Sequence, residues 1–312
     1  MSEEFNFTIP EGLSLRLNTA GKYCGKNIII STTDDENSAA RALWKIITAR
    51  GFTSVPDFLT EIGPYAFAGC NQLVTVQIPD GVSSIGKYAF SDCTNITSVS
   101  LPDGLTRIEG EYAFSNCTKL SLVSLPDGLT RIGTRCFHGC SKLELTSLPD
   151  TVTHLDNYAF WSCVKLALTS LPEGLTNIGG GVFLGCDNLA LTSLPDGITV
   201  IEYQTFYGCE NLALTSLPDG ITTIGSQGFQ DCYRLALTSL PEGLKTIGSQ
   251  GFQNCRGLTE LTFKGTATSI ATNAFTGCTN LKTINVPWAQ GQVANAPWGA
   301  INATINYNYT EG

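Results

Sequence analysis

Residues 209–232 read Cys-Glu-Asn-Leu-Ala-Leu-Thr-Ser-Leu-Pro-Asp-Gly-Ile-Thr-Thr-Ile-Gly-Ser-Gln-Gly-Phe-Gln-Asp-Cys, and they contain one copy of the unit that decides the fold. The cysteine recurs at 23-residue intervals eight times and at a 24-residue interval once. A fixed period of this length predicts a solenoid, in which each unit is one coil and no coil can bury its apolar side chains alone. The ten cysteines are Cys70, Cys93, Cys117, Cys140, Cys163, Cys186, Cys209, Cys232, Cys255 and Cys278.

Positions within a unit are numbered here as slots counted from its cysteine. Slots 3, 8, 12 and 15 are apolar in most units, slot 9 is proline in nine of the ten, and slot 20 is phenylalanine. We expect slots 3 to 8 to form a strand that pairs in parallel with the neighbouring coils, because proline at slot 9 cannot continue the ladder. Slots 12 to 15 predict a second short extended segment. The Ala-Phe-x-x-Cys segment is too short for a full helix and predicts one helical or 3-10 turn.

The ten repeated cysteines are expected to be buried thiols that act as small hydrophobic side chains. Equivalent Cβ atoms of stacked coils lie side by side and point the same way, which is poor geometry for a disulfide. Cys136 stands where most coils have alanine, so it is expected to be a packing substitute, and Cys24 lies outside the array.

The repeat divides the chain into three predicted parts. Residues 1–50 predict an N-terminal cap of strands followed by a helix over 36–50, residues 51–287 a solenoid of ten to eleven coils, and residues 288–312 a C-terminal cap. Two tryptophans beside prolines, Trp288 and Trp298, could cover the last coil, and the alternating segment 301–309 could add a strand. No apolar run is long enough for a membrane span, and the sequence as given does not open with a signal peptide.

The repeated string Leu-x-x-x-x-Leu-Pro-x-x-Leu-x-x-Ile-Gly-x-x-x-Phe-x-x-Cys resembles the BspA-like class of bacterial leucine-rich repeats over about three quarters of the chain. The resemblance implies a right-handed superhelix with a parallel sheet on its concave side. It also implies a cell-surface or secreted binding protein, often one that adheres to host or partner-cell proteins. The N-terminal segment Gly21-Lys-Tyr-Cys-Gly-Lys-Asn-Ile and the tryptophan-rich tail are similar to segments that flank such arrays in gut bacterial and prophage-associated proteins.

Charge and side-chain chemistry narrow the function classes. A net charge of −9 argues against nucleic acid, which requires a basic stripe. The two histidines, His138 and His154, have no repeated partner spacing, and no cluster of acid, base and nucleophile is visible. The segment Cys136-Phe-His138-Gly-Cys140 has the composition of a metal site, but both cysteines occupy core slots. We therefore expect no catalytic activity, no cofactor and no metal.

A row of leucines at slot 5 leaves two interpretations open. If slots 6 and 8 both face the core, the leucines form an exposed apolar strip that would serve as a partner or dimer surface. If the strand is irregular, the leucines are buried and Thr-Ser pairs are exposed, and burial energy favours this second interpretation. The six leucines are Leu122, Leu145, Leu168, Leu191, Leu214 and Leu237.

Two further rows vary from coil to coil and are rich in aromatic residues, which anchor many interfaces. These rings could equally pack on one another without a ligand. We expect them to lie near the short turn and to form the candidate partner-binding surface of the third to seventh coils. The residues five before the cysteine include Tyr65, Tyr88, Tyr112 and Tyr158, and those two before it are His138, Trp161, Leu184 and Tyr207.

The sequence thus predicts a non-catalytic scaffold that binds a protein, such as a host matrix or cell-surface protein. Two alternatives stay open: a glycan-binding module, which the aromatic rows would also suit, and a structural component of a cell-surface or phage-like assembly. Localisation at the cell surface or in the medium follows only from the family resemblance.

Overall fold

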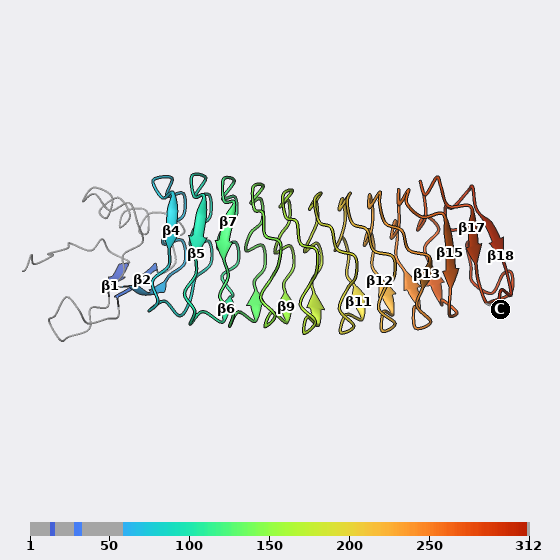
Figure 1. The fold of residues 1–312 in the computed structure, drawn as a ribbon, viewed down its shortest axis with the longest axis horizontal. Coiled ribbons are helices and arrows are strands. Elements are labelled where there is room, and N and C mark those ends of the chain that lie inside the picture. Colours follow the sequence, from blue (N-terminus) through green and yellow to red (C-terminus); the bar gives the residue numbers. More distant parts are fainter. Residues whose placement is uncertain (1–12, 16–27, 33–58, 311–312) are drawn as a thin grey trace, which may run out of the picture.

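The computed structural model describes residues 13–15, 28–32 and 59–310 of the chain. From residue 59 onwards the chain forms a parallel-strand solenoid of about ten turns, stacked along one long axis (Figure 1). The predicted repeat solenoid is therefore confirmed.

Short strands run along two sides of the stack. In Figure 1, β4, β5 and β7 follow the upper side of the first coils, whereas β6, β9, β11 and β12 follow the lower side. Every strand pair is parallel except β1 with β2. The upper strands come from slots 5 to 8 and the lower ones mostly from slots 14 and 15, so the sequence pattern predicts both.

The strands form five sheets. The first contains β1 (Leu13–Leu15), β2 (Ile28–Thr32) and β3 (Leu59–Ile62), and the second β4 (Thr75–Gln77), β5 (Ser98–Ser100) and β7 (Leu122–Ser124). The third contains β6 (Arg107–Ile108), β8 (Arg131–Ile132), β9 (His154–Leu155) and β10 (Asn177–Ile178). The fourth contains β11 (Val200–Ile201), β12 (Thr223–Ile224), β14 (Thr246–Ile247) and β16 (Ser269–Ile270), and the fifth β13 (Ser239–Leu240), β15 (Glu260–Phe263), β17 (Thr283–Asn285) and β18 (Thr304–Asn306).

A column of stacked phenylalanines forms the centre of the core. Consecutive rings from Phe67 to Phe275 lie 5.0–6.0 Å apart between centroids and within 13° of parallel. All of these rings are buried. Large aromatic side chains dominate the burial energy of a core, so this column is the main apolar contact between coils.

The repeated thiols are buried as predicted, and they also make a polar contact. Each repeated thiol from Cys93 to Cys278 donates a hydrogen bond from Sγ to the carbonyl oxygen of the phenylalanine 26 or 27 residues earlier, on the neighbouring coil, at 2.9–3.2 Å. The eleven cysteines of residues 59–310 are all free. Burial raises the pKa of thiols such as Cys163, which keeps the proton on the donor. Cysteine thus fits this slot both as a small apolar group and as a weak donor.

The segment before each cysteine is a run of turns rather than the predicted helical or 3-10 turn, neither of which occurs within residues 59–310. Its N–H groups alternate between two acceptors. In the first coil, the N–H groups of Tyr65 and Phe67 bond to carbonyls of the next coil, whereas those of Ala68 and Cys70 bond three residues back. A 3-10 helix would direct every N–H along its own axis. Every second N–H group of this segment instead forms a hydrogen bond to the next coil.

The slot 5 leucines are buried in four coils and exposed in one. Leu168, Leu191, Leu214 and Leu237 have at most 1% of their surface exposed, Leu145 is half-buried, and Leu122 is 63% exposed. In the coil of Leu122, slot 6 is Val123, which takes the inward position, and β7 pairs with β5. In the four later coils slot 6 is an exposed threonine and the leucine points inward. No strand forms at slots 5 and 6 of these coils, and in the last of them β13 begins at Ser239. The expected irregularity is confirmed for these four coils.

The two ends of the solenoid have further strands. At the N-terminal end β1 pairs antiparallel with β2, and β2 pairs in parallel with β3. At the other end β18 pairs with β17, and the rings of Trp288 and Trp298 are buried against each other and against Phe263. The division into residues 1–50, 51–287 and 288–312 remains a prediction, and the expected helix over 36–50 and Cys24 lie outside the described residues.

The thiol hydrogen bond predicts an unusual order of stabilities at Cys186, which donates to the Phe160 carbonyl at 3.1 Å. Replacing Cys186 by serine retains a donor, whereas replacing it by alanine leaves the site without one. We expect Cys186→Ser to be at least as stable as Cys186→Ala, although a donor's contribution is only about 1 kcal/mol. Urea unfolding midpoints compared at equal slope measure this difference. A clearly more stable alanine variant would mean that the slot is purely apolar.

Because slot 5 is buried in one coil and exposed in another, the same substitution should change the free energy of unfolding by different amounts at the two positions. Leu168→Thr places a hydroxyl in the core and leaves a cavity, so it should reduce the free energy of unfolding by about 2–4 kcal/mol. Leu122→Thr changes an exposed side chain and should stay within about 0.5 kcal/mol of wild type. Thermal and urea unfolding of the two variants provide the comparison, and equal losses would contradict the register assigned to these coils.

Candidate functional site

Aromatic side chains form a continuous column along one edge of the first coils. The rings of Tyr65, Tyr88 and Tyr112 stack with centroids 4.8 and 4.6 Å apart. The Arg135 guanidinium follows, with its Cζ 5.2 Å from the Tyr112 centroid and 4.8 Å from that of Tyr158. The side chains are half-buried. We call Tyr65, Tyr88, Tyr112, Arg135 and Tyr158 the tyrosine column; it unites all four tyrosines that the sequence selected at this slot.

The backbone fixes the direction of these side chains. Each of the five residues has a positive φ, between 53° and 59°, a conformation that non-glycine residues rarely adopt. The N–H of each donates to a carbonyl of the next coil, for example Tyr88 to Glu111 and Tyr112 to Thr134. The ladder therefore holds the slot in register from coil to coil, and the side chains stack in consequence.

Tyr203 joins the column from a different slot. Its ring lies 6.0 Å from that of Tyr158 in an edge-to-face contact, although a whole coil lies between the two residues. That coil has Gly180 and Gly181 where others have side chains, and a Cβ on Gly180 would clash with the Tyr203 ring. Sequence reasoning missed Tyr203 because it stands one position before the repeated slot. The triple glycine of residues 179–181 was the available signal, since it marks room for a neighbouring side chain.

The second predicted row joins the column at one point. The His138 and Trp161 rings are 4.3 Å apart, and Trp161 lies 5.4 Å from Tyr158. Leu184 and Tyr207 are half-buried on the next two coils, and their carbonyls accept hydrogen bonds from Ser162 and Gly185. The structure thus brings His138 and Trp161 to the tyrosine column, while no ring contact within residues 59–310 includes Tyr207.

Past the glycine coil the same slot holds glutamines. Gln204 Nε2 donates to Gln227 Oε1 at 2.8 Å, and Gln227 Nε2 donates to Gln250 Oε1 at 3.4 Å. These three residues also have positive φ. One slot therefore carries an aromatic surface in the first half of the solenoid and an amide ladder in the second.

Burial and neighbouring groups shift the pKa values of Tyr158 and His138 in this surface. Burial, followed by a hydrogen bond with Tyr203, raises the pKa of Tyr158 to about 12. Burial, and to a smaller extent the Arg135 charge, lowers the pKa of His138 below its usual value. At neutral pH Tyr158 is protonated and His138 is uncharged, so Arg135 is the charged group of this cluster.

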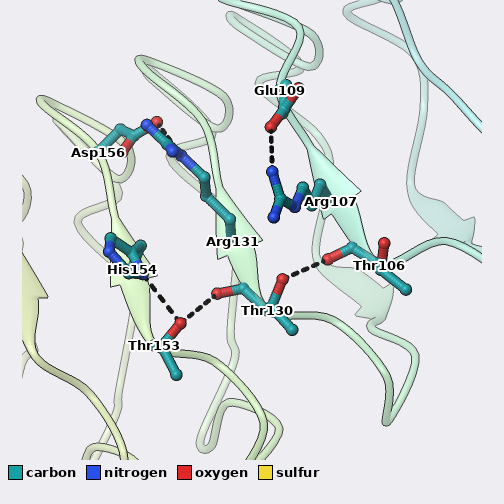
Figure 2. Close-up of polar contacts among 8 residues, drawn as sticks. All are labelled: Thr106, Arg107, Glu109, Thr130, Arg131, Thr153, His154 and Asp156. Carbon is teal, nitrogen blue, oxygen red and sulfur yellow. Dashed lines mark hydrogen bonds and ion pairs between the residues drawn. The ribbon is translucent and has the colours of Figure 1, made fainter.

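A polar surface lies on the sheet that contains β6, β8 and β9 (Figure 2). Arg107 pairs with Glu109 at 3.1 Å and Arg131 with Asp156 at 2.9 Å. Thr130 Oγ1 donates to the Thr106 carbonyl at 3.0 Å, one of several threonine side chains that bridge coils there. Both arginines of this polar surface are therefore paired with carboxylates.

The residues of the possible metal motif have other partners. Cys136 and Cys140 are buried, and the Cys140 thiol donates to the Phe114 carbonyl. His138 Nδ1 lies 3.2 Å from Ser115 Oγ. Within the described residues, no group of three or more His, Cys, Asp or Glu side chains is arranged to hold a metal ion.

The sequence matches the model of the BspA type leucine rich repeat region, in six copies over residues 51–167, 92–213 and 176–295. These matches span more than half of the chain, so the protein belongs to this family of repeat scaffolds, which are generally protein-interaction or surface proteins and generally not catalysts. No functionally curated protein matches the sequence.

Several solved structures of bacterial leucine-rich repeat proteins are similar to this chain. A leucine-rich repeat protein from Bacteroides ovatus is 26% identical over 81% of this chain and 82% of its own, with a TM-score of 0.45. The T. pallidum leucine rich repeat protein is 33% identical over 52% of this chain and 78% of its own, with a TM-score of 0.47. A leucine rich cell surface protein from Faecalibacterium prausnitzii is 22% identical over 99% of this chain and 96% of its own, with a TM-score of 0.50.

The part of the chain that the structure describes has no helix with the length and apolar character to cross a bilayer.

The contact between Tyr203 and the glycine coil predicts a local effect of Gly180→Ala. The new methyl group would displace the Tyr203 ring from Tyr158, and a ring that is 40% exposed can move into solvent. We expect the free energy of unfolding to change by less than about 1 kcal/mol. A crystal structure of the variant should show the Tyr158–Tyr203 contact broken and the rest of the column unchanged; an unmoved Tyr203 would contradict the predicted clash.

Proposed function

We propose that this protein is a non-catalytic scaffold that binds a partner protein through the tyrosine column together with His138, Trp161 and Tyr203. The observation that carries the proposal is the continuity of this surface, because ring contacts and the Arg135 stack link residues from Tyr65 to Tyr203. Tyrosine, tryptophan and arginine are the residue types most enriched in interface hot spots. Leu184 and Tyr207, on the adjoining coils, would lie at its border.

The arrangement of the rings favours a protein over a glycan. A sugar ring usually packs on the face of an aromatic ring. Tyr88 lies between Tyr65 and Tyr112, and Tyr112 lies between Tyr88 and Arg135, so both faces of these two rings are already covered. What remains for a ligand is the outward edge of each ring, which suits the side chains and backbone of a protein.

Self-assembly through a leucine strip has less support. Four of the six slot 5 leucines are buried, Leu145 is half-buried, and Leu122 is the one slot 5 leucine that is exposed. An apolar strip needs several exposed neighbours to drive association.

The partner proposed from the family resemblance is a host matrix or cell-surface protein, met at the cell surface or in the medium. The Faecalibacterium prausnitzii neighbour is described as a cell surface protein. This assignment rests on likeness alone.

The proposed function is tested with purified matrix proteins, namely fibronectin, laminin, fibrinogen and collagen, and in parallel with a glycan array. We expect at least one protein to bind wild type and to bind the double variant Trp161→Ala/Tyr203→Ala about tenfold or more weakly, since hot-spot residues contribute on this scale. Biolayer interferometry provides the dissociation constants.

The matched control is Tyr309→Ala, which removes a side chain of similar exposure (37%) at the far end of the solenoid. It should bind as wild type does. A partner that binds both variants equally well would place the interface elsewhere, and glycan binding that is lost in the double variant would replace the protein partner by a glycan.

A further inference from the structure

Arg135 is the exceptional member of the tyrosine column. It takes the slot that holds tyrosine in the coils on either side, and its guanidinium is stacked between the rings of Tyr112 and Tyr158. Its φ is 53°, so the residue adopts the same uncommon backbone conformation as its neighbours. Stacking of this kind orients the guanidinium and restricts its motion before any ligand arrives.

Arg135 also has no carboxylate partner among residues 61–310. Within residues 61–310 the ion pairs are Lys87–Glu111 at 2.9 Å, Arg107–Glu109 and Arg131–Asp156, of which Figure 2 shows the last two. Arg135 forms none of them, and its buried Nε has no hydrogen-bond acceptor in the described structure. The buried Nε is enclosed by the fold, so a ligand would reach the guanidinium at its terminal Nη1 and Nη2 atoms, which form no hydrogen bond or ion pair within residues 61–310.

The groups that face Arg135 leave its charge uncompensated. They are the two tyrosine rings and the His138 side chain, which burial and Arg135 itself keep uncharged at neutral pH. The chain as a whole has a net charge of −9. An oriented, unpaired cation in such a molecule attracts an anion to one place on its surface.

We propose that Arg135 binds the side-chain carboxylate of an acidic segment of the partner protein. The planar guanidinium matches a carboxylate in a two-bond fork, and charged hydrogen bonds of this kind are among the strongest in proteins. A peptide carboxylate is favoured over an acidic sugar because the column covers the ring faces on which a sugar would stack. This assignment rests on the proposed protein-binding function and names the chemistry that the surface recognises.

The test uses a capped peptide of glycine and serine that contains two glutamates, and a twin in which both are glutamine. Isothermal titration at low salt measures binding to the full chain. We expect the glutamate peptide to bind wild type about tenfold or more tightly than the twin, and Arg135→Gln to remove this preference. Arg135→Lys should lose most of it, because an ammonium group has no planar fork.

Arg107→Gln is the matched control, since it removes the same charge from a different face of the solenoid, and it should bind both peptides as wild type does. Circular dichroism and urea unfolding establish that each variant is folded. Equal binding of the two peptides to wild type, or an equal loss in Arg107→Gln and Arg135→Gln, would overturn the proposal. Tighter, Arg135-dependent binding of a glucuronic acid oligosaccharide than of the glutamate peptide would also overturn it.

The experiment separates this proposal from the function on which it rests. If the glutamate peptide binds through Arg135 but the binding of no matrix protein depends on Trp161 and Tyr203, the carboxylate site is supported and the proposed partner class is contradicted. If a matrix protein depends on Trp161 and Tyr203 but binds Arg135→Gln with wild-type affinity, the interface stands and the carboxylate site falls.

Discussion

The rest of the structure depends on one contact that recurs between coils, namely that of each phenylalanine with the coil that follows it. The rings stack face to face, and the phenylalanine carbonyl accepts both the N–H of the cysteine in its own coil and the thiol of the cysteine in the next. A stack of this kind requires the same backbone path in every coil, because a shift in one would separate both ring and thiol from their partners. The nearly constant 23-residue period of the sequence follows from that requirement.

The same constraint limits how the outward-facing side chains can vary from coil to coil. In the segment before the cysteine, where the same backbone path recurs, a slot that points outward in one coil points outward in the next, and a row of side chains changes character only by substitution. The slot five residues before the cysteine shows this, because it carries tyrosines and Arg135 up to Tyr158, glycine at Gly181 and glutamines from Gln204. The aromatic surface therefore ends near Gly181. Tyr203 extends it, because its ring passes over Gly180 and Gly181 and contacts Tyr158.

The core could be predicted from the sequence because the core slots are apolar in nearly every coil and two of them repeat phenylalanine and cysteine. In the coil of Leu122, the inward residue of slots 5 and 6 could not be predicted, since Leu122 and Val123 are both apolar and a strand can bury only one of two adjacent residues on the same face. The turn before the cysteine was predicted as helical because its length allows that, whereas its hydrogen bonds to the next coil are a property of the stack. Likewise the tyrosines of the column could be selected from their slot, but the contact with Tyr203 depends on a neighbouring coil.

Arg135 combines two unfavourable features in one residue, and the fold offsets them only in part, through the stacking of its guanidinium on Tyr112 and Tyr158. A positive φ is costly for a side chain of this size, and the guanidinium has no carboxylate in the described structure to offset its partial burial. At the equivalent slot the glutamines satisfy one another, and the tyrosines gain contact from stacking without burying a charge. Glutamine or tyrosine at residue 135 would therefore suit the folded chain better. An arginine at this slot is explained better by a ligand outside the chain than by the stability of the coil that holds it.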